Sequence, residues 1–332
     1  MTTLLTGATG FLGKNLLREL LSRGEAVRVL VRSPGALGIE HERLEVVAGD
    51  LRDDAALDTA LRGVERVYHV AAVVKEWVTD WSIFDRVNVD AYETLLKKAM
   101  AARVERIVHT SSFMAIGHSD RHQIADESLE HEPKHFHNPY ERTKYLASLV
   151  TKRYLDKGAP IVTVMPGVIF GPGELTEGNI VLIMVRDMWA GKFPGIPGDG
   201  KKLWSYSFVR DVVAGHILAM EKGQIGRSYI LGGDNVSLDM LVDLAAANLG
   251  KKVPKRHIPL ALLSFSAYFM EKIAGLTGKP PMLTRGKVGV LAHNWAYDSS
   301  RAKNELGYAI TPFEEALGES IRWMREQGII AS

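Results

Sequence analysis

Short apolar runs alternate with longer stretches of helical periodicity along the first half of the chain. A buried strand gives a short continuous apolar run, whereas an amphipathic helix repeats apolar residues every three or four positions. The pattern predicts strands at 3–6, 27–31, 44–47, 66–72, 106–110 and 161–165, and helices at 12–22, 54–61, 87–101 and 140–154. Because strands and helices alternate, we expect a parallel sheet with helices on both faces.

The second half of the chain has a less regular pattern. Its Gly- and Pro-rich segments predict loops at 167–178 and 193–200. A strand is expected at 228–231, and helices are expected at 209–219, 238–249, 260–274 and 313–327. The expected fold class is therefore α/β, with a doubly wound parallel sheet and a smaller C-terminal lobe.

Composition excludes several classes of protein. The 332 residues carry a formal net charge of +2, which leaves no basic excess for nucleic-acid binding. The chain has 0 Cys, so disulfides, thiolate nucleophiles and cysteine zinc sites are excluded, and a reducing, cytoplasmic location is expected. No signal-peptide pattern is visible, and the longest apolar stretch, 258–270, is too short and too interrupted to form an integral membrane segment.

A glycine-rich turn with Gly7, Gly10 and Gly13 joins the first predicted strand to the first predicted helix. Glycine lets the backbone approach a pyrophosphate, and the helix N-terminus offers free N–H groups to it. The strand–turn–helix context indicates a dinucleotide-binding (Rossmann) domain, with a tight structural turn as the alternative. We assign the NAD(P)-binding domain to 1–165 and 205–232, and a substrate-binding lobe to 166–204 and 233–332.

The residue after the second predicted strand bears on which dinucleotide is bound. NAD sites usually place Asp or Glu there to bind the ribose 2′-hydroxyl, but this strand is followed by Arg32 and Ser33. A guanidinium matches the geometry of a 2′-phosphate. The sequence therefore favours NADP over NAD, unless Arg32 is only a solvated loop cation.

A Tyr and a Lys stand four residues apart on a predicted helix. Tyr140 and Lys144 share one helix face, where a nearby ammonium would lower the phenol pKa from its usual value of about 10. Such a Tyr can exchange a proton with a substrate oxygen near neutral pH. The fifth predicted strand ends in Thr110, Ser111 and Ser112, where a hydroxyl can hold a carbonyl oxygen beside the Tyr.

These motifs follow the order typical of the extended short-chain dehydrogenase/reductase superfamily. Within it the chain resembles the NAD-dependent epimerase/dehydratase family, and most of all its bacterial dihydroflavonol-reductase-like members. The resemblance covers almost the whole chain, and it rests on 6–13, Asp50, Ala71, Ala72, Asn88, Ser111, Ser112, Tyr140, Lys144, 166–168 and a C-terminal signature at 298–308.

The resemblance implies a role for each matching residue. Tyr140 would be the acid/base, Lys144 would lower its pKa and hold the nicotinamide ribose, and Ser112, with Ser111 as the alternative, would bind the substrate oxygen. Asn88 would support the site, unless it is only packed in its helix. The implied cofactor-binding residues are Gly7, Thr9, Gly10, Phe11, Leu12, Gly13, Arg32, Asp50, Leu51, Ala71, Ala72, Tyr140, Lys144, Pro166 and Val168.

One position departs from the sugar-nucleotide members of the family. They usually carry a diphosphate-binding Arg shortly before the segment that matches 208–209, and here Trp204 holds that place. An indole offers an apolar face, which favours an uncharged ring-bearing or long-chain substrate. The apolar stretch 259–275 could fold over such a ligand as a lid. Further aromatics expected near the substrate, unless they are ordinary packing residues, are Trp77, Trp81, Phe170 and Trp189.

Five of the 11 histidines lie between positions 118 and 137. The pairs His118/His122 and His131/His135 have helical spacing, which is one pattern of a metal site. The fifth histidine is His137. Pro133 and other residues of this segment predict a loop rather than a helix, so the helical spacing carries little weight. We therefore expect a solvated, substrate-facing loop and no metal site.

The expected function is NADP-dependent reduction of a ketone or aldehyde to an alcohol, or the reverse oxidation, by hydride transfer. The alternatives are an NAD-dependent nucleotide-sugar epimerase or dehydratase, and a non-catalytic NADP-binding regulator. The expected partners are a small carbonyl substrate and a second copy of the chain. A homodimer would pair the Tyr140 helix and the preceding long helix through Leu95, Leu96, Leu146 and Leu149.

Overall fold

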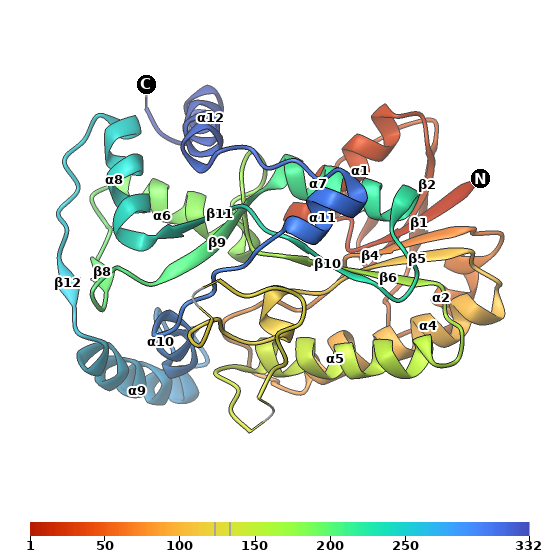
Figure 1. Cartoon of the computed structure of the whole chain (residues 1–332), viewed down its shortest axis with the longest axis horizontal. Helices are drawn as coiled ribbons and strands as arrows, with labels where there is room; N and C mark the ends of the chain where they lie inside the picture. Colours follow the sequence, from red (N-terminus) through yellow and green to blue (C-terminus); the bar gives the residue numbers. More distant parts are fainter. Residues whose placement is uncertain (123, 133, 332) are drawn as a thin grey trace.

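Seven parallel strands form the central sheet of the computed structural model, which describes residues 1–122, 124–132 and 134–331 (Figure 1). Every neighbouring pair in this sheet is parallel. This confirms the predicted doubly wound α/β fold. In order across the sheet, the strands are β10 (Ser228–Leu231), β6 (Ile161–Pro166), β5 (Arg106–Thr110), β4 (Arg66–His69), β1 (Thr2–Thr6), β2 (Ala26–Val31) and β3 (Leu44–Ala48).

The strands are apolar because helices cover both faces of the sheet. Side chains alternate along each strand, so Leu5 and Val29 belong to one buried cluster while Leu4 and Leu30 belong to the other. The first cluster lies under α1 (Phe11–Ser22), α7 (Val209–Lys222) and α11 (Ser300–Leu306). The second lies under α2 (Asp54–Leu61), α4 (Ala91–Ala101) and α5 (Pro139–Leu155).

A smaller lobe surrounds a second sheet, in which β9 (Leu203–Phe208) pairs parallel with β7 (Val168–Phe170) and antiparallel with β11 (Asp234–Ser237). The predicted domain boundary at residue 205 falls inside β9, and the division of the chain into two domains stays a prediction. The other elements of this lobe are α6 (Ile180–Trp189), β8 (Ile196–Pro197), α8 (Leu238–Leu249), β12 (His257–Ile258), α9 (Leu260–Thr277), α10 (Arg285–Leu291) and α12 (Phe313–Glu326).

Several boundaries differ from those expected. The strand predicted at 66–72 ends at His69, and the helix predicted at 87–101 is preceded by α3 (Ile83–Asp85) and begins with a π-helical turn (Arg86–Asp90). The predicted loops 167–178 and 193–200 contain β7 and β8, because these short strands pair with β9 and β12. Short 3-10 turns occur at Pro34–Ala36, Phe113–Ala115 and Glu177–Asn179.

The segment from 118 to 138 contains no helix among its described residues, as its polar and Pro-rich sequence predicts. Pro133, one of the residues on which that prediction rests, lies outside the described residues, as does residue 123.

Two of the leucines predicted to form a dimer contact lie inside the protomer instead. Leu95 and Leu96 of α4 are completely buried in the apolar cluster shared with α2 and α5. They cannot meet a second copy, because their side of α4 faces the sheet. Leu149 of α5 is 43% exposed and Leu146 is half-buried, so only the α5 part of the predicted surface is accessible.

Three buried rings form a stack beside β4 and β5. The Tyr92 ring lies 5.0 Å from the His69 ring and 4.1 Å from the His109 ring, and all three are close to parallel. His69 Nδ1 is hydrogen-bonded to Thr6 Oγ1 at 2.9 Å, whereas neither ring nitrogen of His109 has a partner among the described residues. Burial lowers the pKa of both histidines, that of His69 to about 3, so both are neutral at pH 7.

This stack should make the stability of the fold depend on pH. Below its ordinary pKa of about 6.5 a histidine of the unfolded chain binds a proton, while folded His109 stays neutral, so stability falls as the pH drops. His109→Phe should reduce that loss by up to about 1.4 kcal/mol per pH unit between about pH 6.5 and 4, as measured by urea unfolding. Tyr92→Phe is the control, because it removes only the 2.8 Å hydrogen bond to Thr151 and should lower stability equally at each pH. An unchanged pH slope in His109→Phe would contradict this account.

Candidate active site

The turn between β1 and α1 packs tightly against the end of β4. Gly7 has a φ of +78°, and a Cβ at this position would lie 2.7 Å from the backbone nitrogen of Ala71. A Cβ at Gly13 would overlap the carbonyl group of Gly7. The packing of the turn itself therefore requires glycine at both positions.

The same turn leaves the N-terminus of α1 open. Gly10 is the N-cap residue, with an extended backbone and no side-chain cap, so the first N–H groups of the helix can face a ligand. Thr9 is half-buried in the turn, and Phe11 and Leu12 are buried in the first turn of the helix. These backbone N–H groups, at the carboxyl edge of a parallel sheet, form a cradle that fits a dinucleotide pyrophosphate.

The residues after β2 and β3 lie at the same edge of the sheet. Arg32 directly follows β2 and is exposed. The Asp50 carboxylate, just after β3, accepts two hydrogen bonds from Arg52 at 2.8 Å. These bonds, together with the more distant charge of Arg32, lower the pKa of Asp50 to about 2. Leu51 is buried beside it in the second apolar cluster.

The ends of β4 and β6 complete this edge. The half-buried Ala71 donates its N–H to Thr6 Oγ1 at 3.4 Å, and Ala72 follows it, also half-buried. Pro166 is the buried last residue of β6, and Val168 begins β7 two residues later. The predicted cofactor-binding residues at the ends of β1, β2, β3, β4 and β6 thus lie at one edge of the sheet.

Helix α5 carries Tyr140 and Lys144. It begins at Pro139, after the N-cap residue Asn138, whose Oδ1 accepts a hydrogen bond from the Glu141 N–H at 2.8 Å. Lys144 Nζ lies 5.8 Å from the centre of the Tyr140 ring and donates a 2.9 Å hydrogen bond to the carbonyl of Thr110. Because Thr110 is the last residue of β5, this bond holds the helix against the end of the strand.

Burial controls the protonation of this pair. It lowers the pKa of Lys144 to about 8, and it raises the pKa of Tyr140 to about 12, an effect that the Ser112 side chain partly opposes. The role of Lys144 in lowering the pKa of Tyr140 stays a prediction, because its ammonium is bonded to the Thr110 carbonyl and the raised pKa of Tyr140 comes from desolvation. At neutral pH Tyr140 is a phenol that can donate a proton.

A cavity of about 1050 Å³ lies in front of Tyr140. Ser112 lines this cavity, and its Oγ accepts a hydrogen bond from the Met114 N–H at 3.2 Å. Ser111 does not line the cavity, and its N–H is bonded to the carbonyl of Val164 in β6 at 2.8 Å. Val168 lines the same cavity as Tyr140 and Ser112.

Three of the five aromatics expected near the substrate line this cavity. These three are Trp77, Trp81 and Trp204. The ring centres of Trp77 and Trp81 lie 5.2 Å apart in an edge-to-face arrangement, and Trp204 donates its indole N–H to the His293 carbonyl at 3.1 Å. The other two do not reach the cavity. Phe170 is buried in the core of the lobe, and the Trp189 ring packs under Lys251 Nζ, 3.4 Å from the ring centre.

Comparison with known proteins assigns this arrangement to a family. Residues 3–232 match the model of the NAD dependent epimerase/dehydratase family. The chain belongs to the NAD-dependent epimerase/dehydratase family. This confirms the resemblance inferred from the motifs, and it makes the protein an enzyme of the NAD(P)-dependent epimerase, dehydratase and reductase superfamily.

Relatives match over nearly the whole chain. A putative dihydroflavonol 4-reductase of Synechocystis sp. is 33% identical, over 98% of this chain and 95% of its own length. Sterol demethylase protein B of Methylococcus capsulatus is 33% identical, over 99% of this chain and 100% of its own. The solved structure of a dTDP-glucose 4,6-dehydratase from Streptomyces venezuelae, with NAD bound, superposes with a TM-score of 0.81 at 26% identity and covers 99% of each chain.

A buried amide joins the cavity wall of this family member to α5. Asn88, in the π-helical turn, accepts a hydrogen bond from the Val73 N–H at 2.7 Å. It donates to the Val73 carbonyl at 3.1 Å and to Thr143 Oγ1 at 3.0 Å. Asn88 therefore connects the chain segment that leads to Trp77 with the helix that carries Tyr140.

Glu141 is a site residue that the sequence analysis missed. Its buried carboxylate is hydrogen-bonded to His131 Nε2 at 2.9 Å, and it accepts a hydrogen bond from the His137 N–H at 2.7 Å. These bonds fix the chain that enters α5 next to Tyr140. An acidic residue in the first turn of a helix is common for electrostatic reasons alone, so the sequence held no signal for this contact.

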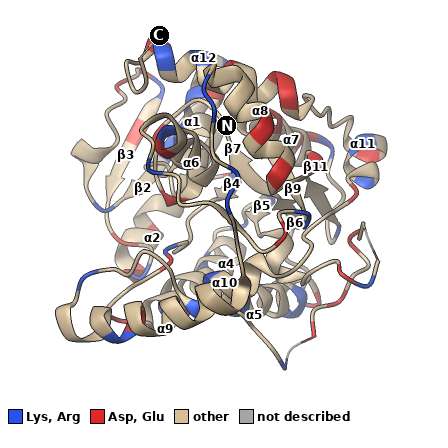
Figure 2. Ribbon diagram, turned by 90° about the vertical axis from the view of Figure 1, so that its left-hand side faces the viewer, with Lys and Arg blue, Asp and Glu red and all other residues tan. Residues whose placement is uncertain are grey.

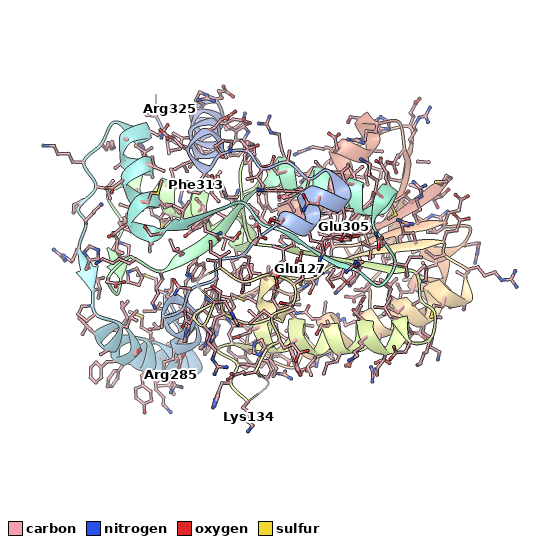
Figure 3. The ribbon with its side chains drawn as sticks, viewed as in Figure 1. Glu127, Lys134, Arg285, Glu305, Phe313 and Arg325 are labelled. Atoms are coloured by element: carbon pink, nitrogen blue, oxygen red, sulfur yellow. The ribbon has the colours of Figure 1, made fainter. Side chains whose placement is uncertain are left out.

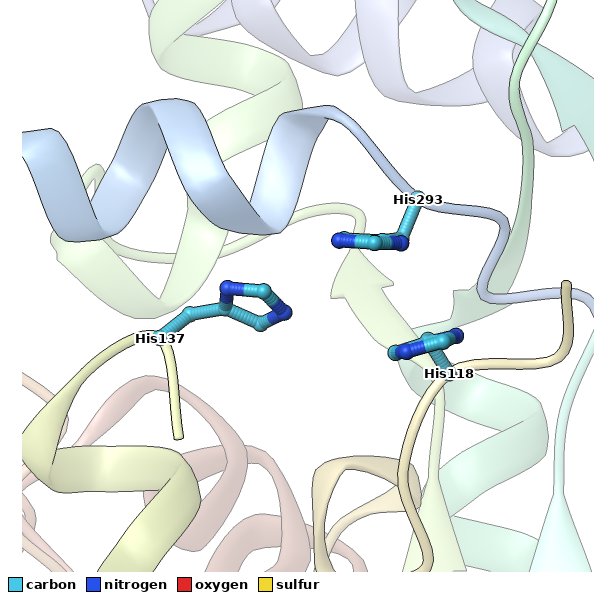
Figure 4. A group of neighbouring side chains, drawn as sticks. All are labelled: His118, His137 and His293. Atoms are coloured by element: carbon cyan, nitrogen blue, oxygen red, sulfur yellow. The ribbon is translucent and has the colours of Figure 1, made fainter. Parts of the chain in front are cut away.

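Three imidazoles come together between this chain segment and the lobe, those of His118, His137 and His293 (Figure 4). One nitrogen of each lies within 4.8 Å of the others. The His118 and His293 rings are stacked 4.1 Å apart, and His293 Nδ1 is bonded to Asp120 Oδ2 at 2.6 Å. Tetrahedral zinc ligands lie about 3.3 Å apart, so the rings would have to turn to share an ion. Neither pair predicted from helical spacing forms this group, and the absence of a metal site stays a prediction.

Proposed function

We propose that this family member reduces the carbonyl group of an apolar ketone or aldehyde with NADPH. The observation that carries the proposal is a half-buried, protonated Tyr140 on a cavity whose lining includes three tryptophans. One of these is Trp204, at the position where a diphosphate-binding Arg is expected in sugar-nucleotide members. The name of the reductase relative supports a reduction, and the name of the sterol demethylase relative supports an apolar substrate.

In this proposal the backbone N–H groups of the Gly7–Gly13 turn would hold the cofactor pyrophosphate, and Tyr140 and Lys144 would hold its nicotinamide end. When bound, the reduced nicotinamide supplies the hydride that adds to the carbonyl carbon. The Ser112 hydroxyl donates a hydrogen bond to the carbonyl oxygen, and Tyr140 transfers its proton to that oxygen to give the alcohol. Lys144, held by the Thr110 carbonyl, provides a positive charge near the phenolate that remains.

The second candidate is a nucleotide-sugar epimerase or dehydratase that uses NAD, as the NAD-bound dehydratase structure suggests. Lys75, Lys202, Arg285 and Lys287 line the cavity and could pair with a diphosphate. Two of these charges already have partners, because Arg285 pairs with Glu271 at 2.7 Å and Lys287 with Glu76 at 3.5 Å. A non-catalytic regulator is disfavoured, since it would not need Ser112 and Tyr140 at the cavity.

Turnover on a substrate panel tests the proposed function. With NADPH, the protein should reduce aromatic or long-chain ketones and leave UDP-, GDP- and dTDP-sugars unchanged. Tyr140→Phe removes the proton donor and should lower kcat by about 10²–10⁴-fold without weakening cofactor binding. Tyr145→Phe on the same helix is the control, because Tyr145 does not line the cavity and its ring packs on His131 and Phe136. Conversion of a nucleotide sugar with no ketone reduction would establish the second candidate instead.

The choice of dinucleotide depends on Arg32 in this proposal. Its exposed guanidinium at the end of β2 would pair with the 2′-phosphate, so NADPH should bind more tightly than NADH. Arg32→Ala should weaken NADPH binding by about tenfold or more and leave NADH binding unchanged, as measured by fluorescence titration. Arg18→Ala, an exposed Arg on α1, is the matched control. Equal binding of both cofactors to the unaltered protein would refute this role.

We also propose that the protein is a homodimer that pairs through the exposed side of α5. Leu149 lies on that side, one turn before Arg153, which pairs with Glu93 of α4 at 2.9 Å. Light scattering at micromolar concentration should give twice the chain mass of 36.6 kDa, and Leu149→Lys should shift the mass toward that of the monomer. A monomer mass for the unaltered protein would rule the dimer out.

A further inference from the structure

Helix α9 leaves several large apolar side chains exposed. Only Ala267 and Ala274 of its 18 residues are buried, and Leu260, Leu263 and Met270 on the same side are half-buried. Side chains spaced three or four residues apart form one stripe along a helix. Five such residues are between 50% and 89% exposed: Leu262, Phe265, Phe269, Ile273 and Leu276. Figure 3 shows the side chains of α9 projecting outward from the ribbon.

Neighbouring residues widen this stripe into a surface. Tyr268 is 42% exposed, and Met282, just beyond the helix, is 82% exposed. The ring centres of Phe265 and Phe269 lie 4.9 Å apart, and those of Tyr268 and Phe269 lie 5.4 Å apart. These aromatic rings therefore pack against one another on the outside of the protein. A continuous exposed apolar patch of this kind marks an interaction surface.

The chain around this surface is strongly basic. Segment 251–287 holds eight Lys and Arg residues but a single acidic residue, Glu271, which pairs with Arg285. Its net charge of +7 exceeds the +2 of the whole chain, so the rest of the molecule is net negative. Lys272 and Lys279 are exposed, and neither forms an ion pair in the described part of the chain. Figure 2 shows blue positions along α9 at the lower edge of the molecule.

We propose that α9 binds the surface of an anionic lipid bilayer. A helix with exposed Phe and Leu on one side and nearby Lys lies in the interface, with its apolar side among the acyl chains and its ammonium groups at the headgroups. Among the residues that the structure describes, no helix is long and apolar enough to cross a bilayer, so α9 would lie along the membrane surface. A second copy of the chain is a poorer occupant, because the exposed Lys272 and Lys279 of two such surfaces would repel each other.

The lipid-binding surface of α9 would lie beside the cavity. Glu271 of α9 lines the cavity, as do Arg285 and Lys287 of the neighbouring α10 (Figure 1). If the proposed reduction of an apolar carbonyl compound holds, the substrate could pass from the lipid into the cavity past these residues. Lipid binding itself does not depend on the reaction.

Sedimentation of the full chain with lipid vesicles tests the proposal. The protein should bind vesicles of phosphatidylcholine mixed with phosphatidylglycerol more tightly than vesicles of phosphatidylcholine alone, and added salt should weaken the binding. The double variant Phe265→Ser/Phe269→Ser should lower the vesicle affinity by about 100-fold, about tenfold for each ring withdrawn from the lipid. Lys272→Glu/Lys279→Glu should remove only the preference for anionic vesicles.

Met240→Ser is the matched control, because this residue of α8 is 51% exposed but lies outside the α9 surface. All the altered side chains are exposed, so thermal unfolding should stay unchanged. The proposal is overturned by absence of binding to both kinds of vesicle, or by full binding of the Phe265→Ser/Phe269→Ser variant. It is also overturned if the protein ignores vesicles and forms an oligomer that this variant disperses, since a second copy would then cover α9. Reduction of a water-soluble ketone without vesicles reports on the proposed function separately.

Discussion

The parallel register of the central sheet is the constraint on which the candidate site depends. Because all seven strands run in one direction, the chain leaves each strand at the same edge. The glycine turn after β1, Arg32 after β2 and Ser112 after β5 therefore lie along this one edge, although they are far apart in sequence. The hydrogen bond from Lys144 Nζ to the Thr110 carbonyl then holds α5 against this edge and brings Tyr140 to it.

Burial at this edge determines both the stability of the site and its chemistry. Lys144, Asn88 and Glu141 are buried polar residues, and each has hydrogen-bond partners that offset the loss of water. Tyr140 is desolvated as well, and the result is a phenol that keeps its proton at neutral pH.

The nucleotide-binding half could be predicted because its signals are local. Apolar strands, the glycine turn and the four-residue spacing of Tyr140 and Lys144 can each be recognised within a short stretch of sequence. The lobe could not be predicted in the same way, because β7, β9 and β11 become strands only by pairing with one another. The type of a residue also does not show where its side chain points in the folded protein. Trp204 lines the cavity while Phe170 is buried in the core, and His118 and His137 meet His293 through tertiary packing that no spacing indicates.

The fate of a deuterium label tests the central claim most directly, because the claim is net hydride transfer from NADPH to a carbonyl carbon. The protein is incubated with an apolar ketone and NADPH that carries deuterium at the transferred position, and the product is analysed by mass spectrometry and NMR. The account predicts an alcohol with one deuterium on the former carbonyl carbon and a solvent-derived proton on oxygen. Unlabelled alcohol, or conversion of a nucleotide sugar with no net loss of NADPH, would contradict it.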